Sequence, residues 1–114
     1  MAQIGKPYVW GAKGPNSFDC SGLVYYAYTS LGISVPRATE GYKTKTAYEI
    51  SWSEAQPGDI LIIYQSERGS SYTSGHAGIY LGNDEYIHSP QTGQKVKTAK
   101  GAQKRFTHVF RFTN

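Results

Sequence analysis

One cysteine and two histidines are the side chains in this chain whose types and positions suggest covalent chemistry. Cys20 is the only cysteine among 114 residues, and it lies in the segment NSFDCSG, residues 16–22. A lone thiol forms no internal disulfide and no zinc site built on several cysteines. The simplest interpretation is a small buried hydrophobe, so the surroundings of Cys20 must decide whether it is a nucleophile.

The surroundings of Cys20 predict the start of a helix. Asn16, Ser17 and Asp19 can each cap a first helical turn, and Gly32 stands where a C-terminal cap belongs. The free N–H groups and partial positive charge of a helix start favour a thiolate over a thiol. Between the caps, apolar residues recur at helical spacing: Leu23, Val24, Ala27, Tyr28 and Leu31.

The remaining sequence predicts strands after the helix, and therefore an α+β fold in a single domain. The polar stretch 38–47 is typical of a short helix, 57–59 of a turn, and 60–64 of a strand. Residues 65–75 show no period and predict a loop, and residues 106–112 predict a closing strand.

A hairpin predicted at residues 76–89 brings the two histidines together. If Gly82-Asn83-Asp84 is its loop, His76 and His88 share one face as diagonal neighbours. The opposite face is then apolar, made of Ala77, Ile79, Leu81 and Ile87. The facing pairs in this register are Leu81 with Glu85, Tyr80 with Tyr86, and Gly78 with His88.

Cys20, His76 and His88 have the chemistry of a nucleophile, a base and an orienting group. An imidazole takes the thiol proton and later delivers it to a leaving amine, while a polar group on its far nitrogen fixes the tautomer. These roles need no metal or other cofactor, and a zinc ion would need a third ligand. His108, among basic and aromatic residues, is interpreted as an ordinary surface or hydrogen-bonded histidine.

Composition narrows the classes of partner. The net charge of +4 suits anionic partners such as cell-wall polymers, nucleic acid or a membrane surface. No apolar run approaches the ~20 residues of a membrane helix, no secretory signal begins the chain, and no nucleic-acid motif accompanies the charge. We therefore expect neither membrane insertion nor nucleic-acid binding. The basic stretch 95–105 predicts a solvated face, or a contact with anionic wall polymers.

Six segments, taken in order, resemble the NlpC-type papain-like cell-wall peptidases. Each segment alone is a weak signal, but all six occur in family order between residues 4 and 90. The resemblance implies a compact papain-like fold, with the cysteine-bearing helix packed on an antiparallel sheet. The segments are GKPYVWG (5–11), FDCSGLV (18–24), PR (36–37), QPGDIL (56–61), GHAGIYLG (75–82) and IHSP (87–90).

The resemblance implies hydrolysis of amide bonds in peptidoglycan stem peptides, usually the bond from γ-D-glutamate to the diamino acid. By position, Cys20 matches the nucleophile, His76 the general base and acid, and His88 the orienting residue. Tyr8 matches a tyrosine near the nucleophile that helps the oxyanion site. The implied protein is a monomer that acts outside the cell or in the cell wall.

Three further residues match substrate-facing positions of some relatives. Asp19 and Ser21 match residues that hold the free amine of an N-terminal L-alanine, and helix capping is an equal alternative for both. Arg37 lies in the Pro-Arg segment and is either substrate-facing or a solvated surface arginine.

Two other functions stay open under this resemblance. One is a cysteine-histidine amidase that cuts the sugar–peptide bond, and the other is an inactive cell-wall-binding module of the same fold. Residues 1–114 are expected to form one NlpC-type domain of a secreted, phage or mobile-element protein. A helix usually precedes the first segment in the family; only four residues precede Gly5, so that helix is expected to be missing, shortened or cut away.

Overall fold

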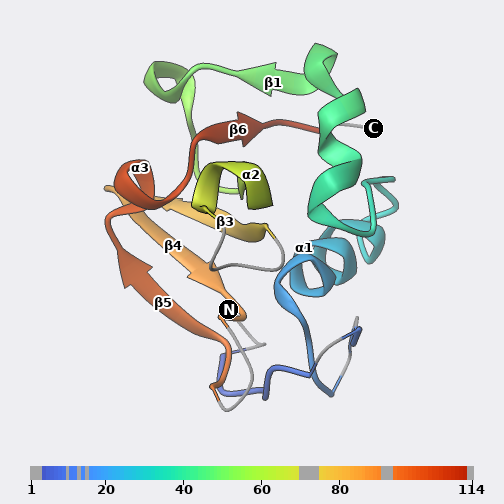
Figure 1. The fold of residues 1–114 in the computed structure, drawn as a ribbon. Helices are drawn as coiled ribbons and strands as arrows, with labels where there is room; N and C mark the ends of the chain where they lie inside the picture. Colours follow the sequence, from blue (N-terminus) through green and yellow to red (C-terminus); the bar gives the residue numbers. More distant parts are fainter. Residues whose placement is uncertain are drawn as a thin grey trace.

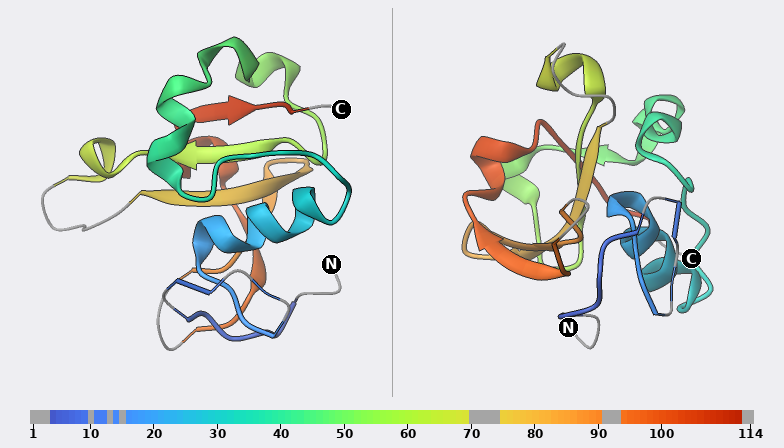
Figure 2. Two further views of the ribbon diagram at one scale, coloured as in Figure 1. Left: turned by 90° about the vertical axis from the view of Figure 1, so that its right-hand side faces the viewer. Right: turned by 60° about the horizontal axis from the view of Figure 1, so that its bottom comes forward.

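The computed structural model describes residues 4–9, 11–12, 14, 16–69, 75–90 and 94–112. These residues form an α+β fold around one six-stranded sheet of order β1-β6-β2-β3-β4-β5, in which every pair is antiparallel. The helix α1 (Cys20–Thr29) lies on one side of β3 and α3 (Ala102–Arg105) on the other (Figure 1, Figure 2). The strands are β1 (Glu49–Ile50), β2 (Ile60–Ile63), β3 (His76–Gly82), β4 (Glu85–His88), β5 (Lys97–Lys100) and β6 (His108–Phe110).

The helix α1 begins and ends with the predicted caps. The Asp19 side chain accepts a hydrogen bond from the N–H of Gly22. At the other end Gly32 has a φ of +77°, and the N–H groups of Gly32 and Ile33 bond back to carbonyls of the last turn. This is the Schellman pattern, which favours glycine because of its left-handed backbone.

The predicted apolar stripe of α1 is confirmed except at Leu31, since Tyr28 also packs against the core. Leu23 and Val24 are buried against the sheet, but Leu31 is 69% exposed. Leu31 lies beyond the last helical residue, in the capping turn, and that turn no longer follows the sheet.

The continuous apolar run of β2 reflects burial on both faces of the sheet. Ile60 and Ile62 pack with Val24 of α1, whereas Leu61 packs on the other side with Phe106 and Val109. A strand covered on both faces needs no alternation of apolar and polar residues. A third apolar cluster, under the N-terminal segment, is formed by Phe18, Leu23, Ile87 and Val96.

The predicted turn of the β3–β4 hairpin is wrong by one residue. Gly82, and not Leu81, pairs with Glu85, and the register shifts next to this pair. Asn83 and Asp84 have φ values of 53° and 63°, so they form a two-residue turn whose twist suits a hairpin. Leu81, between the Tyr80–Tyr86 and Gly82–Glu85 pairs, has no register partner on β4 and forms a β-bulge.

The irregularity leaves the rest of the hairpin in the predicted register. Tyr80 pairs with Tyr86, and Ile79 pairs with Ile87. Ala77, Ile79 and Ile87 lie on the apolar side that packs against α1 and the N-terminal segment.

Several other elements differ from the sequence prediction. In place of the single short helix predicted at residues 38–47 there are two 3₁₀ helices, η1 (Thr39–Thr44) and η2 (Thr46–Tyr48). A third, η3 (Trp52–Glu54), follows β1. The predicted loop 65–75 begins with a short helix, α2 (Gln65–Arg68), because the Glu67 carboxylate accepts the N–H of Tyr64 and caps it. Residues 70–74 of that loop lie outside the described residues.

The basic stretch at residues 95–105 contains two elements that were not predicted. It forms β5, at the edge of the sheet, and α3. An edge strand of mostly exposed, charged residues shows no clear hydrophobic period. The closing strand β6 begins only at His108, because the preceding residues end α3.

His108 bridges two carboxylates, and this bridge predicts a pH-dependent stability. Burial lowers the pKa of His108, but hydrogen bonds to Glu49 (2.6 Å) and Glu67 (3.0 Å) outweigh burial and raise it above 6.5. A raised histidine pKa stabilises the fold fully below about pH 6.5, and this contribution is lost as the pH rises through the folded-state value.

We therefore expect His108→Gln to lower the free energy of unfolding near pH 5.5 more than near pH 8.5. The difference should be below about 1 kcal/mol, because solvent screens a partly exposed bridge. Urea denaturation of both proteins over this pH range measures it. A loss of stability that does not change with pH would contradict the charged bridge.

Candidate active site

The candidate site lies where the start of α1 meets the start of β3. The Sγ of Cys20 is 3.9 Å from the carbonyl oxygen of Gly75, the residue before His76. Two glycines next to the site leave no room for a side chain. A Cβ on Gly75 would lie 2.5 Å from the Ile63 carbonyl oxygen, and one on Gly22 would lie 2.1 Å from the Ala12 carbonyl oxygen.

His76 and His88 form a buried pair, as the shared strand face predicted. The Nε2 of His76 is 2.8 Å from the Nδ1 of His88, and the two residues are 1% and 2% exposed. The His76 ring also stacks on Phe106, with ring centroids 5.7 Å apart and an interplanar angle of 13°. Because Nε2 is committed to His88, Nδ1 is the nitrogen of His76 left to take up a proton from a thiol.

The buried position of His76 favours its neutral form. Burial lowers the pKa of His76 well below 6.5, and the positive charge of Arg105 lowers it further, with smaller contributions from His88 and Arg68. A neutral imidazole is the form that can act as a base.

The surroundings of Cys20 favour the protonated thiol and not the thiolate that the helix start predicts. Burial of the sulfur and the neighbouring Asp19 carboxylate raise the pKa of Cys20. The backbone N–H groups of Ala77 and Ser21 and the Arg68 guanidinium lower it, but by less. The helix start therefore contributes in the expected direction, and burial outweighs it. Both side chains are therefore neutral, the sulfur as a thiol and His76 as an imidazole.

Tyr8 lines the same cavity as Cys20. Burial raises the pKa of Tyr8, with smaller contributions from Cys20 and Asp19, so the phenol remains a hydrogen-bond donor. The backbone N–H of Tyr8 donates to the backbone carbonyl oxygen of Gln94 (2.9 Å). This bond ties the N-terminal segment to the chain just before β5. The left view of Figure 2 shows this segment in deep blue crossing beside the orange part of the chain.

Asp19, Ser21 and Arg37 form one charged cluster in the wall of this cavity. Arg37 Nη2 lies 3.1 Å from Asp19 Oδ2, and Arg37 Nη1 donates to Ser21 Oγ at 3.2 Å. Arg37 also donates to the carbonyl oxygens of Gly11 (3.0 Å) and Ala12 (3.4 Å). The Asp19 carboxylate also caps the helix by accepting the N–H of Gly22, and Arg37 is an ion-pair partner as well as a surface residue.

Two residues at the site were not predicted as site residues. Arg68 donates to the carbonyl oxygen of Gly75 at 3.3 Å, and Phe106 packs under the His76 ring. Arg68 falls in a segment without periodicity and Phe106 in a predicted strand, so neither carries a local signal for this contact.

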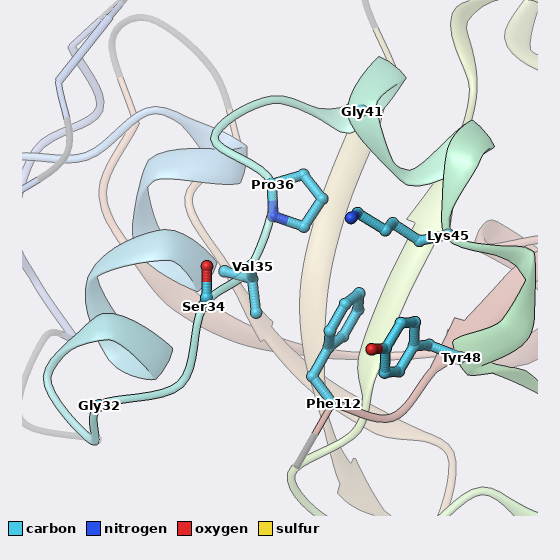
Figure 3. A pocket seen from close by; sticks show the side chains of 8 residues that line it. All are labelled: Gly32, Ser34, Val35, Pro36, Gly41, Lys45, Tyr48 and Phe112. Atoms are coloured by element: carbon cyan, nitrogen blue, oxygen red, sulfur yellow. The ribbon is translucent and has the colours of Figure 1, made fainter. Parts of the chain in front are cut away.

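The cavity beside Cys20 has a volume of about 300 Å³. A larger cavity, of about 560 Å³, lies where Tyr48 stacks on Phe112 with ring centroids 4.6 Å apart (Figure 3). Among the described residues, no cysteine or histidine lines this larger cavity. We therefore place the candidate site at the smaller cavity, which contains the Cys20 thiol. The smaller cavity is lined by Tyr8, Asp19, Cys20, Ser21, Arg37, Ala38, Thr39 and Gly75.

Neither a metal cluster nor a membrane-spanning helix is found in the part of the chain that the structure describes. Within those residues, no three His, Cys, Asp or Glu side chains gather where they would hold a metal ion. Within the same residues, no helix is long and apolar enough to cross a membrane.

Comparison with known sequences identifies relatives over nearly the whole chain. The family model described as "NlpC/P60 family" matches residues 5–112. A protein named murein DD-endopeptidase MepH, from Escherichia coli strain K12, is 48% identical over 100 residues, covering 85% of this chain and 36% of that protein. A probable endopeptidase p60 from Listeria seeligeri is 40% identical over 101 residues, covering 87% of this chain and 18% of that protein. The chain thus spans well under half the length of these relatives.

Comparison with solved structures finds the same fold. The NlpC/p60 domain of the peptidoglycan hydrolase SagA has a TM-score of 0.77 and 36% identity, covering 96% of this chain and 90% of that domain. The peptidoglycan hydrolase RipB of Mycobacterium tuberculosis has a TM-score of 0.74 and 30% identity, covering 96% of this chain and 59% of that structure. The cysteine-bearing helix on an antiparallel sheet and the match over residues 5–112 show that this chain belongs to the NlpC/P60 family.

Proposed function

We propose that this chain is a cysteine endopeptidase that hydrolyses peptidoglycan stem peptides through Cys20, His76 and His88. The observation that carries the proposal is the 2.8 Å contact between His76 Nε2 and His88 Nδ1. His76 directly follows Gly75, whose carbonyl oxygen faces the Cys20 sulfur. The names of the relatives, murein DD-endopeptidase and probable endopeptidase, support the same class of reaction.

The mechanism follows from the protonation states. Nδ1 of His76 takes the proton of the Cys20 thiol as Sγ attacks the scissile carbonyl carbon. The developing oxyanion accepts hydrogen bonds from the backbone N–H of Cys20 and from the Tyr8 hydroxyl. His76 then gives its proton to the leaving amine, and a water activated by the same nitrogen hydrolyses the thioester. His88 Nδ1 holds the His76 ring by accepting its Nε2–H throughout.

The Asp19–Arg37 ion pair lines the cavity and is therefore expected to influence which stem peptides bind there. We propose that Asp19, Ser21 and Arg37 contact the peptide on the side of the cavity they line. A free L-alanine amine would have to displace the Arg37 guanidinium from the Asp19 carboxylate. This arrangement favours stem peptides that are still attached to glycan, and therefore action in the cell wall outside the cell.

Two bonds are candidates within this proposal. The first is the γ-D-glutamyl–diamino acid bond that the sequence resemblance implies. The second is a bond between two D-configured centres, which the name of the 48% identical relative favours.

Mass spectrometry of purified peptidoglycan and defined muropeptides after digestion by the chain tests the proposal. A new amine on the diamino acid with γ-glutamyl release identifies the first bond, and opening of D,D cross-links identifies the second. Release of whole stem peptides from the glycan would replace the proposal with the amidase. Absence of any cleavage by a folded chain would favour the binding module.

The lowered pKa of His76 predicts the acid limb of the pH profile. Only neutral His76 accepts the thiol proton, so kcat/KM should stay constant as the pH falls through 6.5 and decline only well below it. Stopped assays on a carboxyl-amidated muropeptide, which removes substrate titration, measure this limb.

A matched pair of variants tests the cause of the shift. Arg105→Gln should move the acid limb to higher pH, because this cation lowers the pKa of His76. Lys104→Gln removes the same charge from the exposed neighbouring position and should leave the limb in place. A wild-type limb centred at 6.5 or above would contradict the buried neutral base.

A further inference from the structure

A separate cavity is lined by His88, the partner of His76 in the buried pair. Its volume is about 290 Å³, well above the ~10–15 Å³ that a single water molecule needs. Among the residues that the structure describes, it shares no lining residue with the cavity beside Cys20. Its lining residues are Tyr86, His88, Pro90, Gln94, Lys97, Ala99 and Arg105.

His88 lines this cavity, and one of its ring nitrogens is buried without a hydrogen-bond partner. Nδ1 of His88 contacts His76, whereas Nε2 has no hydrogen-bond partner among the described residues, although the whole residue is 2% exposed. Buried polar atoms in folded proteins are nearly always paired. An unpaired buried nitrogen on a residue that lines a cavity therefore points to a ligand group that binds there and completes the hydrogen bond.

The proton arrangement of the histidine pair fixes the chemistry of the missing group. In the proposed function, His76 keeps Nδ1 free as a base, so its proton sits on Nε2 and is donated to His88 Nδ1. Neutral His88 must then carry its own proton on Nε2. The open atom is a donor, and the group that completes it is a hydrogen-bond acceptor.

Two cations at the cavity indicate that the acceptor is an anion. Lys97 of β5 is the register partner of His88 on β4, so it stands beside that ring on a rigid pair of strands. Arg105, at the end of α3, lines the same cavity. Among the described residues neither cation forms an ion pair with a carboxylate. Gln94 adds a neutral amide donor.

We propose that this cavity binds a small phosphate-type oxyanion, which accepts the Nε2–H of His88 and is held by Lys97 and Arg105. The anion completes the hydrogen-bond chain from cavity to His88 to His76, and favours the His88 tautomer that the base needs. Only this tautomer argument rests on the proposed function; the cations and the buried unpaired atom do not. The anion is therefore expected to activate the enzyme and not to inhibit it.

Binding is tested without turnover, by NMR of the Cys20→Ala chain with ¹⁵N-labelled histidine. Inorganic phosphate is titrated near pH 7 at constant ionic strength. We expect a saturable shift of the His88 Nε2–H signal, and ¹⁵N shifts that report protonation at Nε2. Lys97→Gln and Arg105→Gln should each weaken binding about tenfold or more. Lys100→Gln and Lys104→Gln, which remove equal charge from exposed positions on the same two elements, should not.

The source of the anion is distinguished by a second titration with dimethyl phosphate. Binding of the diester as well as phosphate means that phosphodiesters of wall polymers fit, and binding of phosphate alone means a free ion. No saturable shift with either compound would overturn the proposal and leave the cavity to water. An equal loss of binding in the two control variants would overturn it as non-specific charge attraction. A chain that binds phosphate and cuts no muropeptide would retain the site and refute only the proposed function.

Discussion

Cys20→Ala is expected to remove cleavage of muropeptides by about four orders of magnitude or more, while the chain stays folded. Removing a covalent nucleophile deletes the intermediate, and the remaining groups cannot replace it. The stability cost should be small, because the sulfur contacts the Gly75 carbonyl oxygen at 3.9 Å, a weak hydrogen bond at most. Turnover of a defined muropeptide, followed by mass spectrometry, gives the loss, and thermal unfolding verifies the fold.

Cys20→Ser is the matched control for this prediction. Serine keeps the shape and the polar atom beside Gly75, but a hydroxyl is far harder to deprotonate than a thiol. We expect nearly the same loss as for alanine. Cleavage by Cys20→Ala above about one per cent of wild type would show that the chain hydrolyses its substrate without a thiol nucleophile.

The parts of the site that follow local patterns were predictable from the sequence. Asp19 and Gly32 mark the ends of α1 by their side-chain and backbone chemistry, so Cys20 was placed at the helix start. Strand alternation in the β3–β4 hairpin placed His76 and His88 on one face. The error in the turn did not disturb this, because the bulge lies at the turn, beyond the Tyr80–Tyr86 pair.

The parts that depend on tertiary contacts were not predictable. Nothing in the spacing of Asp19 and Arg37 signals their ion pair, which forms only because the segment after α1 returns to the helix start. Phe106, under His76, ends α3 at the position where the sequence predicted the start of a strand, so its contact with His76 had no local signal. The protonation of Cys20 was expected from the helix start alone, whereas burial, a property of the whole fold, decides it.

His88→Leu is expected to lower kcat/KM by about 10² to 10⁴-fold. The His88 Nδ1 is the acceptor that keeps the proton of His76 on Nε2 and holds the ring in place. Leucine fills much of the same volume but accepts no hydrogen bond. The His76 ring then turns or adopts the other tautomer, and wrong-tautomer losses of this size are typical of an orienting residue.

His88→Asn separates this orienting role from a merely structural one. The asparagine Oδ1 stands the same number of bonds from the backbone as the histidine Nδ1, and it accepts a hydrogen bond. We expect His88→Asn to recover activity to within about tenfold of wild type, although asparagine fills the volume of histidine less well than leucine does. Thermal unfolding of both variants shows whether stability follows activity. If leucine and asparagine reduced kcat/KM equally, in proportion to their loss of stability, His88 would support the fold and not the base. The hydrogen bond at 2.8 Å would then have no part in catalysis.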